Sequence, residues 1–192
     1  KVINYEPKDA ICLKTAAMRK ASNNQEVLDF LKEKTQMNFK IIDGKEEARL
    51  TLLAVKYALK RENIDSQNFI LLDIGGGSTE IIVNTNDSYF AHSFDFGIVT
   101  MTQQYIKTHD LNKELENRKK EIDAFLKSLD INLWNYSFVA TAGTPTTIAA
   151  IKLGQDFFTY DRNVVNGAIV DLNDLDYCLN IFNNSSSDEI AR

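Results

Sequence analysis

Apolar residues recur along the chain with two spacings, and together these predict a mixture of helices and strands. Helical spacing marks residues 25–35, the segment after Asp43, residues 98–107, 112–129 and 146–153, and finally 172–182. Short apolar runs typical of strands lie at 9–13, 39–42, 68–74, 80–83, 89–94 and 137–141. Strand and helix patterns that follow one another in this way predict an α/β fold.

Some of these patterns also predict burial. Ala48, Leu52, Val55 and Leu59 recur at spacings of four, three and four, which indicates one buried helix face. The strand at 68–74 shows no polar alternation, so we expect it to be central and covered on both faces. The strand at 137–141 is predicted to be buried as well. In the final helix, the buried stripe is predicted to be Leu175, Leu179 and Phe182.

The polar connector at 61–68 is the best candidate for a boundary in the chain. It predicts a first unit over residues 1–66 and a second over 67–192. The composition (192 residues, 44% hydrophobic and 26% charged) is that of a globular protein. No apolar run approaches the roughly 20 residues that cross a bilayer, so we expect no membrane partner.

The net charge of -5 argues against a protein that holds DNA by broad electrostatic attraction, although a local anion site remains open. Cys12 and Cys178 are far apart in sequence and match no metal-ligand or redox spacing. We expect both to be buried free thiols in a reducing cytoplasm.

A glycine-rich segment, DIGGGSTE at 73–80, is the first candidate site. Gly75, Gly76 and Gly77 follow a strand directly, which favours a tight backbone turn or a close approach to a ligand. No lysine follows as in a Walker loop, and the next segment resembles a strand, which excludes a dinucleotide fingerprint. A plain hairpin turn remains an alternative to a phosphate site. In the phosphate site, backbone amides and the hydroxyls of Ser78 and Thr79 would bind the anion.

Carboxylates near this segment suggest further chemistry. Asp73 leaves the strand directly before the glycines, where it could hold Mg²⁺ through water. Asp43 with Glu46 three positions later is a helix start signal, so a capping role explains Glu46. Glu47 has no such local duty, and a general base facing a cleft is the alternative to a surface carboxylate.

A second glycine motif, ATAGTPTT at 140–147, places Gly143 and Thr144 between a strand and a helix. Ordinary capping, with Thr144 as N-cap and Pro145 as the first helical residue, is one interpretation. An anion bound at the helix start is the other.

The order of four segments resembles the exopolyphosphatase / guanosine pentaphosphate phosphohydrolase family, Ppx/GppA. They are KTAAMRKASN at 14–23, IIDGKEEARL at 41–50, DIGGGSTEIIV at 73–83 and ATAGTPTTIAAI at 140–151. The resemblance runs from about residue 11 to 170. It implies a ribonuclease-H-like, actin-like fold of two lobes across a cleft. It also implies a family strand-turn-strand loop before Lys1 and closing helices after the last residue, so we expect an incomplete fragment of that fold.

The resemblance also implies an activity and a role for each matching residue. A terminal phosphate would be hydrolysed from inorganic polyphosphate, or the 5′ γ-phosphate from guanosine pentaphosphate, by direct attack of water with Mg²⁺ (or Mn²⁺). Glu47 resembles the catalytic carboxylate and Arg19 the phosphate-clamping arginine. Asp73 and Glu80 match carboxylates near the metal, and the range Gly75 to Thr79 matches the phosphate loop. Gly143 and Thr144 resemble the second glycine motif.

The resemblance further implies a bacterial, cytoplasmic hydrolase that forms a homodimer. Two alternatives remain open. One is an ATP-binding kinase or chaperone-like member of the actin-like superfamily. The other is a non-catalytic phosphate-binding fragment.

Overall fold

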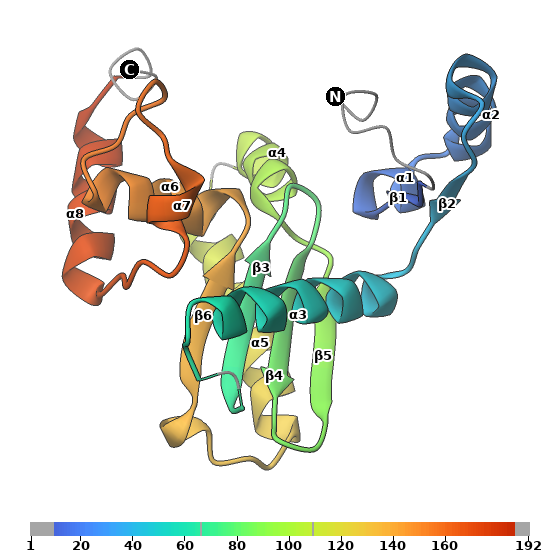
Figure 1. The fold of residues 1–192 in the computed structure, drawn as a ribbon. Coiled ribbons are helices and arrows are strands. Elements are labelled where there is room, and N and C mark those ends of the chain that lie inside the picture. The colour runs from blue at the N-terminus through green and yellow to red at the C-terminus, as the bar shows by residue number, and fades with distance from the viewer. Residues whose placement is uncertain (1–9, 66, 109, 187–192) are drawn as a thin grey trace.

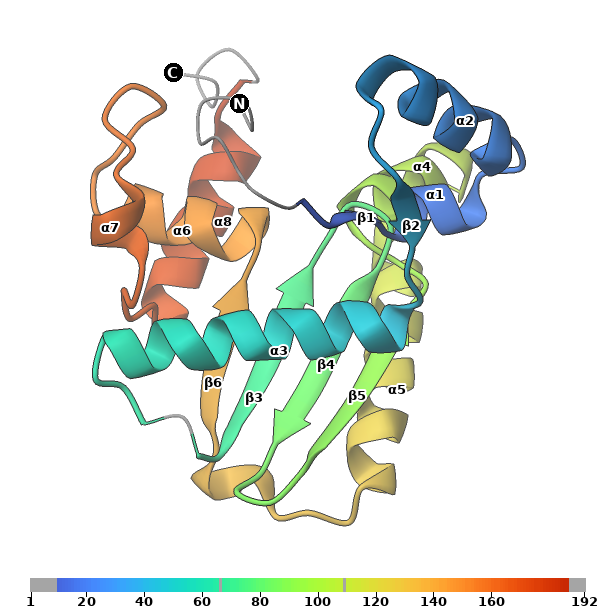
Figure 2. The same ribbon diagram turned by 45° about the vertical axis from the view of Figure 1, so that its right-hand side comes forward.

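The computed structural model describes residues 10–65, 67–108 and 110–186 of the chain, which form two sheets and the helices around them (Figures 1 and 2). The strands of the smaller sheet are β1 (Cys12–Lys14) and β2 (Phe39–Ile41). The strands of the larger sheet are β3 (Phe69–Ile74), β4 (Thr79–Asn84), β5 (Tyr89–Phe94) and β6 (Ser137–Thr141). The predicted α/β class is confirmed, and so are five of the predicted strands to within about a residue at each end. The strand predicted at 9–13 is observed at Cys12–Lys14, and residue 9 lies outside the described residues.

The helices connect the strands and cover the larger sheet. The N-terminal ones are α1 (Ala16–Lys20), α2 (Asn24–Thr35) and α3 (Gly44–Arg61). The others are α4 (Ile98–Thr108), α5 (Leu111–Ser128), the 3₁₀ turn η2 (Leu133–Asn135), α6 (Gly143–Lys152), α7 (Arg162–Val165) and α8 (Leu172–Asn184). Among the described residues, no helix has both the length and the apolar character needed to cross a membrane.

The larger sheet has the strand order β5-β4-β3-β6. β4 runs antiparallel to both of its neighbours, whereas β6 runs parallel to β3. Because β3 and β6 are parallel, the two predicted glycine motifs, each following one of these strands, lie at the same end of the sheet. This arrangement brings segments about 70 residues apart in sequence to one edge.

Helix α3 crosses one face of this sheet, and α5 lies behind the other (Figure 2). The predicted stripe on α3 forms the main hydrophobic core with alternate residues of β3 and β4, as the period of two in a strand requires. This core comprises Ala48, Leu52, Leu59, Phe69, Leu71 and Ile82. On the far face, Phe125 of α5 packs against the His92 and Phe94 rings of β5.

The connector at 61–68 separates α3 from β3, yet α3 shares its core with the larger sheet. The division into lobes at residue 66 therefore stays a prediction. The unit of β1, α1, α2 and β2 stands beside the loop end of the sheet (Figures 1 and 2). This unit lies close to the loop that joins β3 to β4. A Cβ placed on Gly77 of that loop would lie 3.5 Å from the Cβ of Ala16.

Two burial predictions for the C-terminal region are wrong. Among the described residues β6 is an outer strand that pairs with β3 alone, and its Phe138 is 66% exposed. The stripe of Leu175, Leu179 and Phe182 on α8 is exposed, whereas the neighbouring Cys178 is buried. α8 packs against α6 through the face that carries Cys178, and not through the face that its apolar spacing predicts. Cys12 and Cys178 are both free thiols, as predicted, but only Cys178 is buried and Cys12 is partly exposed.

Candidate functional site

The two adjacent glutamates in the first turn of α3 have different partners. The side chain of Asp43 accepts a hydrogen bond from the Glu46 amide at 2.8 Å, which starts the helix as the sequence predicts. Glu46 points outward and forms two hydrogen bonds with Arg49, which lowers the pKa of Glu46. Glu47 points toward the β1–β2 unit instead. The predicted cap at Asp43 is confirmed, but the Glu46 side chain does not complete a capping box, because it binds Arg49 instead. Glu47 is left available for chemistry.

Arg19 holds the Glu47 carboxylate. Its Nη1 donates to Oε2 of Glu47 at 2.7 Å and to the carbonyl of Ile42 at 2.9 Å. Both side chains are about one-fifth exposed, so the ion pair is partly shielded from water. The structure records no partner for Nε or Nη2 of Arg19 among the described residues, so these donors remain for an anion. The two residues that the sequence analysis proposed as catalytic are thus brought together from segments 28 residues apart.

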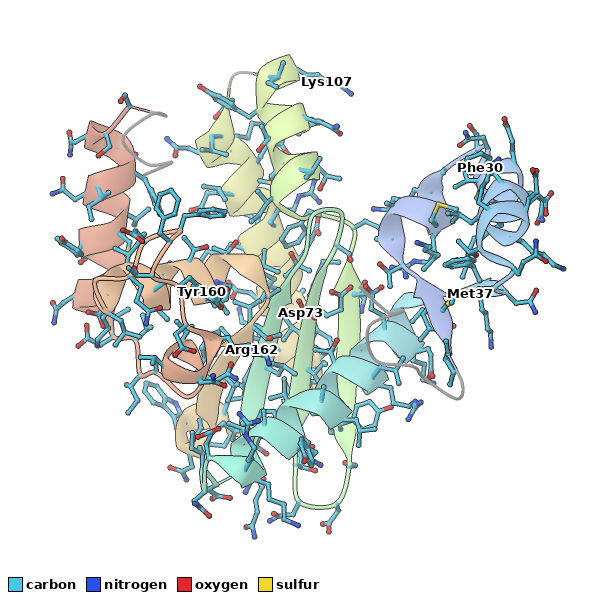
Figure 3. The ribbon with its side chains drawn as sticks, turned by 45° about the horizontal axis from the view of Figure 1, so that its top comes forward. Phe30, Met37, Asp73, Lys107, Tyr160 and Arg162 are labelled. Carbon is cyan, nitrogen blue, oxygen red and sulfur yellow. The ribbon has the colours of Figure 1, made fainter. Side chains whose placement is uncertain are left out.

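A row of polar residues crosses the sheet on the face that α3 covers. Asp73 of β3 pairs with Glu80 of β4, and Glu80 pairs with Ser93 of β5. On its other side Asp73 pairs with Thr141, the last residue of β6. Figure 3 shows Asp73 near the loop end of β3, with the β1–β2 unit and the α6–α8 helices on either side. The row therefore lies at the end of the sheet from which both glycine motifs start.

The two carboxylates of this row are held by hydroxyl groups. Ser93 donates to Oε1 of Glu80 at 2.6 Å, and Thr51 donates to Oδ2 of Asp73 at 3.2 Å. Thr51 lies four residues after Glu47 on α3, so the same helix face carries both side chains. The sequence analysis missed Thr51 and Ser93. The spacing from Glu47 is the one signal that could have indicated Thr51.

Burial raises the pKa of both Asp73 and Glu80. The negative charge of Glu47 adds to the rise at both groups, and Asp73 adds to the rise at Glu80. The hydroxyl of Thr51 partly offsets the effect at Asp73, and that of Ser93 at Glu80. Three carboxylates thus share this region, and Glu80 is only 2% exposed.

This excess of negative charge fits a divalent cation. Mg²⁺ is usually held by one or two carboxylates together with water and substrate phosphates. Within the described part of the chain, no three His, Cys, Asp or Glu side chains form a group that could hold a metal by themselves. Asp73 and Glu80 are paired across β3 and β4 and would be the two carboxylates of such a site, and their role as metal ligands stays a prediction.

The glycine loop between β3 and β4 packs against the start of α4. The Gly75 amide closes the turn by donating to the Ser78 carbonyl at 3.0 Å. Gly97 fits beneath the loop, because a Cβ there would lie 2.4 Å from the Gly75 oxygen and 2.7 Å from the carbonyl carbon of Gly76. Gly97, to which the sequence analysis assigned no role, is therefore the glycine that this packing requires.

The hydroxyls of the loop already have partners. Thr79 donates its hydroxyl to the Phe96 carbonyl at 2.8 Å, and the Ser78 hydroxyl interacts with Glu80. The predicted contacts of these two residues with phosphate would therefore come from the backbone rather than from their side chains.

The second glycine motif begins its helix earlier than predicted. Ala142 is the N-cap, with a left-handed φ of 72°, and α6 starts at Gly143. The prediction that Thr144 caps the helix and Pro145 opens it is wrong. The Thr144 hydroxyl is instead buried and has no hydrogen-bond partner among the described residues. Gly143 and Thr144 follow Thr141, the β6 partner of Asp73, and their role in substrate binding stays a prediction.

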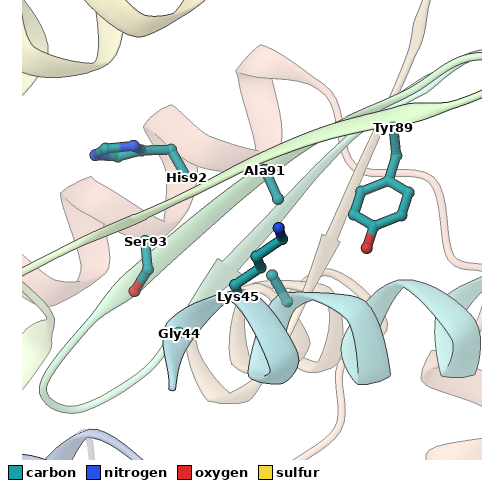
Figure 4. Close-up of a pocket in the computed structure, with 7 residues that line it drawn as sticks. Gly44, Lys45, Tyr89, Ala91, His92 and Ser93 are labelled. Carbon is teal, nitrogen blue, oxygen red and sulfur yellow. The ribbon is translucent and has the colours of Figure 1, made fainter.

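A pocket of about 420 Å³ lies beside this site, between the first turns of α3 and strand β5 (Figure 4). Its walls include Gly44, Lys45, Tyr89 and Ser93. Figure 4 shows Ser93 pointing toward α3, while His92 points to the opposite side of the sheet. The pocket reaches the carboxylate row only through Ser93, and it is lined by neither Glu47 nor the loop glycines.

Several known proteins are similar to this chain. A bifunctional 3-dehydroquinate synthase/phosphatase of Fusobacterium nucleatum is 28% identical over 83% of this chain and 24% of its own length. A guanosine-5'-triphosphate,3'-diphosphate pyrophosphatase of Pseudoalteromonas atlantica is 30% identical over 78% of this chain and 30% of its own. Exopolyphosphatase 2 of Mycobacterium tuberculosis is 26% identical over 66% of this chain and 39% of its own.

The crystal structure of the Aquifex aeolicus member of the Ppx/GppA family has the same fold, with a TM-score of 0.71 and 25% identity. The match covers 98% of this chain and 60% of that one, so the chain spans less than two thirds of these relatives. The predicted actin-like α/β fold is confirmed, as a part of the family architecture. A sequence profile of the Ppx/GppA phosphatase family matches residues 2–174. The chain belongs to the Ppx/GppA phosphatase family.

Proposed function

We propose that this chain carries the catalytic part of a phosphohydrolase. Its substrate would be inorganic polyphosphate, which loses its terminal phosphate, or guanosine pentaphosphate, which loses its 5′ γ-phosphate. The names of two relatives, an exopolyphosphatase and a guanosine-5'-triphosphate,3'-diphosphate pyrophosphatase, support these two substrates. The observation that carries the proposal is the 2.7 Å pair of Arg19 and Glu47 at the end of the sheet that also bears the glycine loop.

In this proposal Glu47 orients the attacking water and accepts its proton. Arg19 holds Glu47 with Nη1 and offers its remaining donors to non-bridging phosphate oxygens. The amides of the glycine loop hold the same phosphoryl group from the other side. Phosphoryl transfer needs mainly positioning and charge neutralisation, and these groups supply both.

Mg²⁺ or Mn²⁺ would supply further charge neutralisation when bound at Asp73 and Glu80. The pairing of the two carboxylates on neighbouring strands supports this assignment, since a bound cation would offset their mutual repulsion. The cytoplasmic location, a homodimer and the lack of a DNA or membrane partner stay predictions.

Adjacent glutamates provide the test of this function. Glu47→Gln keeps the size of the side chain and removes the base, so we expect phosphate release from polyphosphate and from guanosine pentaphosphate to fall by about 10²- to 10⁴-fold. Glu46→Gln alters only the exposed contact with Arg49 and is the matched control, with release within about twofold of the wild type.

If Glu47→Gln released phosphate at the same rate as the wild-type chain, Glu47 would have no role in the reaction. ATP should be assayed in parallel with both substrates. Tight binding of ATP without hydrolysis of either substrate would favour a kinase-like or chaperone-like protein over a phosphohydrolase.

A further inference from the structure

The carbonyl oxygens of Gly75, Gly76 and Gly77 each accept a hydrogen bond, which fixes the orientation of the three peptide planes of the glycine loop. The Gly75 oxygen accepts from the Ile98 amide at 3.0 Å. The Gly76 oxygen accepts from the amides of Val99 at 2.9 Å and Thr100 at 3.3 Å. These donors belong to the first turn of α4, so the start of this helix fixes two of the three planes.

The third plane is held by a side chain from the other sheet's unit. Nζ of Lys20, the last residue of α1, donates to the Gly77 oxygen at 3.0 Å. Nζ also lies 3.1 Å from the carboxylate of Asp95. Both contacts are exposed, and Asp95 is 87% exposed; exposed ion pairs contribute little, so the hydrogen bond to Gly77 is the contact that bears on the loop.

Holding the carbonyls sets the direction of the amides. In a trans peptide the C=O and the following N–H point in opposite directions, and no peptide of the described residues is cis. The amides of Gly76, Gly77 and Ser78 thus face away from α4 and Lys20. None of the hydrogen bonds within residues 10–65, 67–108 and 110–186 uses these three amides as donors. An amide without a protein acceptor is a donor that remains for a ligand.

We infer that Lys20 is a positioning residue for the phosphate loop. By holding the Gly77 oxygen it aims the Ser78 amide at the bound phosphoryl group, as α4 does for the amides of Gly76 and Gly77. This inference rests on the proposed function, because it assumes that the amides bind phosphate. Lys20 follows Arg19 on α1, so this one short helix positions both the arginine side chain and the glycine loop.

The first experiment needs no ligand. Lys20→Met keeps most of the aliphatic stem and removes the donor, whereas Lys20→Arg keeps a charged donor. We expect Lys20→Met to shift the ¹⁵N resonance of the Ser78 amide and the ¹³C resonance of the Gly77 carbonyl, and Lys20→Arg to restore most of both. Lys34→Met, which removes a lysine of α2 paired with Glu33 at 3.7 Å, is the control and should move neither.

The second experiment measures binding of inorganic tripolyphosphate to the 192-residue chain by calorimetry. We expect Lys20→Met to weaken binding about tenfold, the scale of one charge-assisted hydrogen bond, and Lys20→Arg to stay within about threefold. A long-range effect of charge would fade between about 0.05 and 0.5 M salt, whereas a positioning effect would persist. The Lys34→Met control should bind as the wild type does.

Different results overturn different conclusions. Unmoved resonances in Lys20→Met, or a loss of affinity that Lys20→Arg shares equally or that high salt abolishes, would show that Lys20 does not position the loop. If the resonances move but the unchanged chain binds no tripolyphosphate, the hydrogen bond stands and the phosphate-binding role of the loop is refuted, together with the proposed function.

Discussion

The larger sheet with α3 and the C-terminal helices α6–α8 differ in how they bury apolar side chains. The first region encloses its stripe, and Phe69, Leu71 and Ile82 are shielded from solvent entirely. The second has a small core of Ala149, Ala150 and Val165, while large apolar side chains around it remain exposed. Among the exposed ones are Phe157, Phe158, Leu172, Tyr177 and Leu179. Apolar spacing thus marks a buried face only where another described element covers it.

This difference also concerns the site. The carboxylate row and the glycine loop are built on the enclosed region, where α3 and α4 fix the backbone. The second glycine motif opens the exposed region, and nothing lies within 4 Å of a Cβ placed at Gly143. Rigid elements hold polar groups in place more accurately than loops do. We therefore place the chemistry in the first region.

The largest effect expected from this comparison is on stability. Leu71→Ala removes a side chain that is 0% exposed in the main core, and we expect a loss of about 2–5 kcal/mol in the free energy of unfolding. Leu179→Ala makes the same change on α8, where the side chain is 57% exposed, and should cost less than about 0.5 kcal/mol. Urea denaturation of both variants measures the difference.

A comparable loss in both variants would contradict the comparison, since it would mean that the apolar face of α8 is covered in solution. Analytical ultracentrifugation of the unchanged chain would then show whether self-association provides the cover.

A second pair of variants compares the glycines of the two regions. Gly97→Ala places a methyl group 2.4 Å from the Gly75 oxygen, so the loop and the start of α4 must separate. We expect a loss of about 1–3 kcal/mol, the usual cost of overpacking, and weaker binding of tripolyphosphate. Gly143→Ala meets no neighbouring atom and should change stability by less than about 0.5 kcal/mol. Equal losses in the two variants would show that the fit of Gly97 under the loop is not needed.

The sequence predicted the parts of the fold that depend on local patterns. The stripe on α3, the cap at Asp43 and the distinction between Glu46 and Glu47 follow from spacing and capping chemistry. The contact of Arg19 with Glu47 was not predicted, because no local pattern links residues 28 positions apart and the resemblance to a family supplied only a separate role for each. The roles of all the named site residues remain predictions, although the structure gathers these residues at one end of the sheet.

Other features could not be predicted because they depend on tertiary contacts. Gly97 is required by the backbone of a loop 20 residues earlier, and Ser93 is placed by the register of β4 with β5. The helix start at Gly143 depends on the left-handed backbone of Ala142, which a sequence pattern does not indicate for alanine. The exposed face of α8 has the apolar spacing of a buried face, so the sequence pattern does not indicate its exposure.

The smallest effect concerns the cost of the carboxylate row itself. Because its pKa is raised, Glu80 favours the folded state below its ordinary value of 4.5, and this contribution is lost as the pH rises through the raised pKa. Glu80→Gln keeps an acceptor for Ser93 and removes the buried charge. We expect it to stabilise the chain on the order of 1 kcal/mol at pH 7 in the presence of a chelator, while phosphate release falls.

Two conditions sharpen this prediction. The advantage of Glu80→Gln should shrink as the pH falls toward 4.5, because the wild-type carboxyl group then takes up its proton. Mg²⁺ should stabilise the wild type more than the variant, since a bound cation favours the ionised carboxylate. Denaturant titrations over this pH range, with and without Mg²⁺, separate the two effects. If Glu80→Gln were less stable than the wild type at pH 7, the buried carboxylate of Glu80 would stabilise the fold, and the expected cost of the carboxylate row would be refuted.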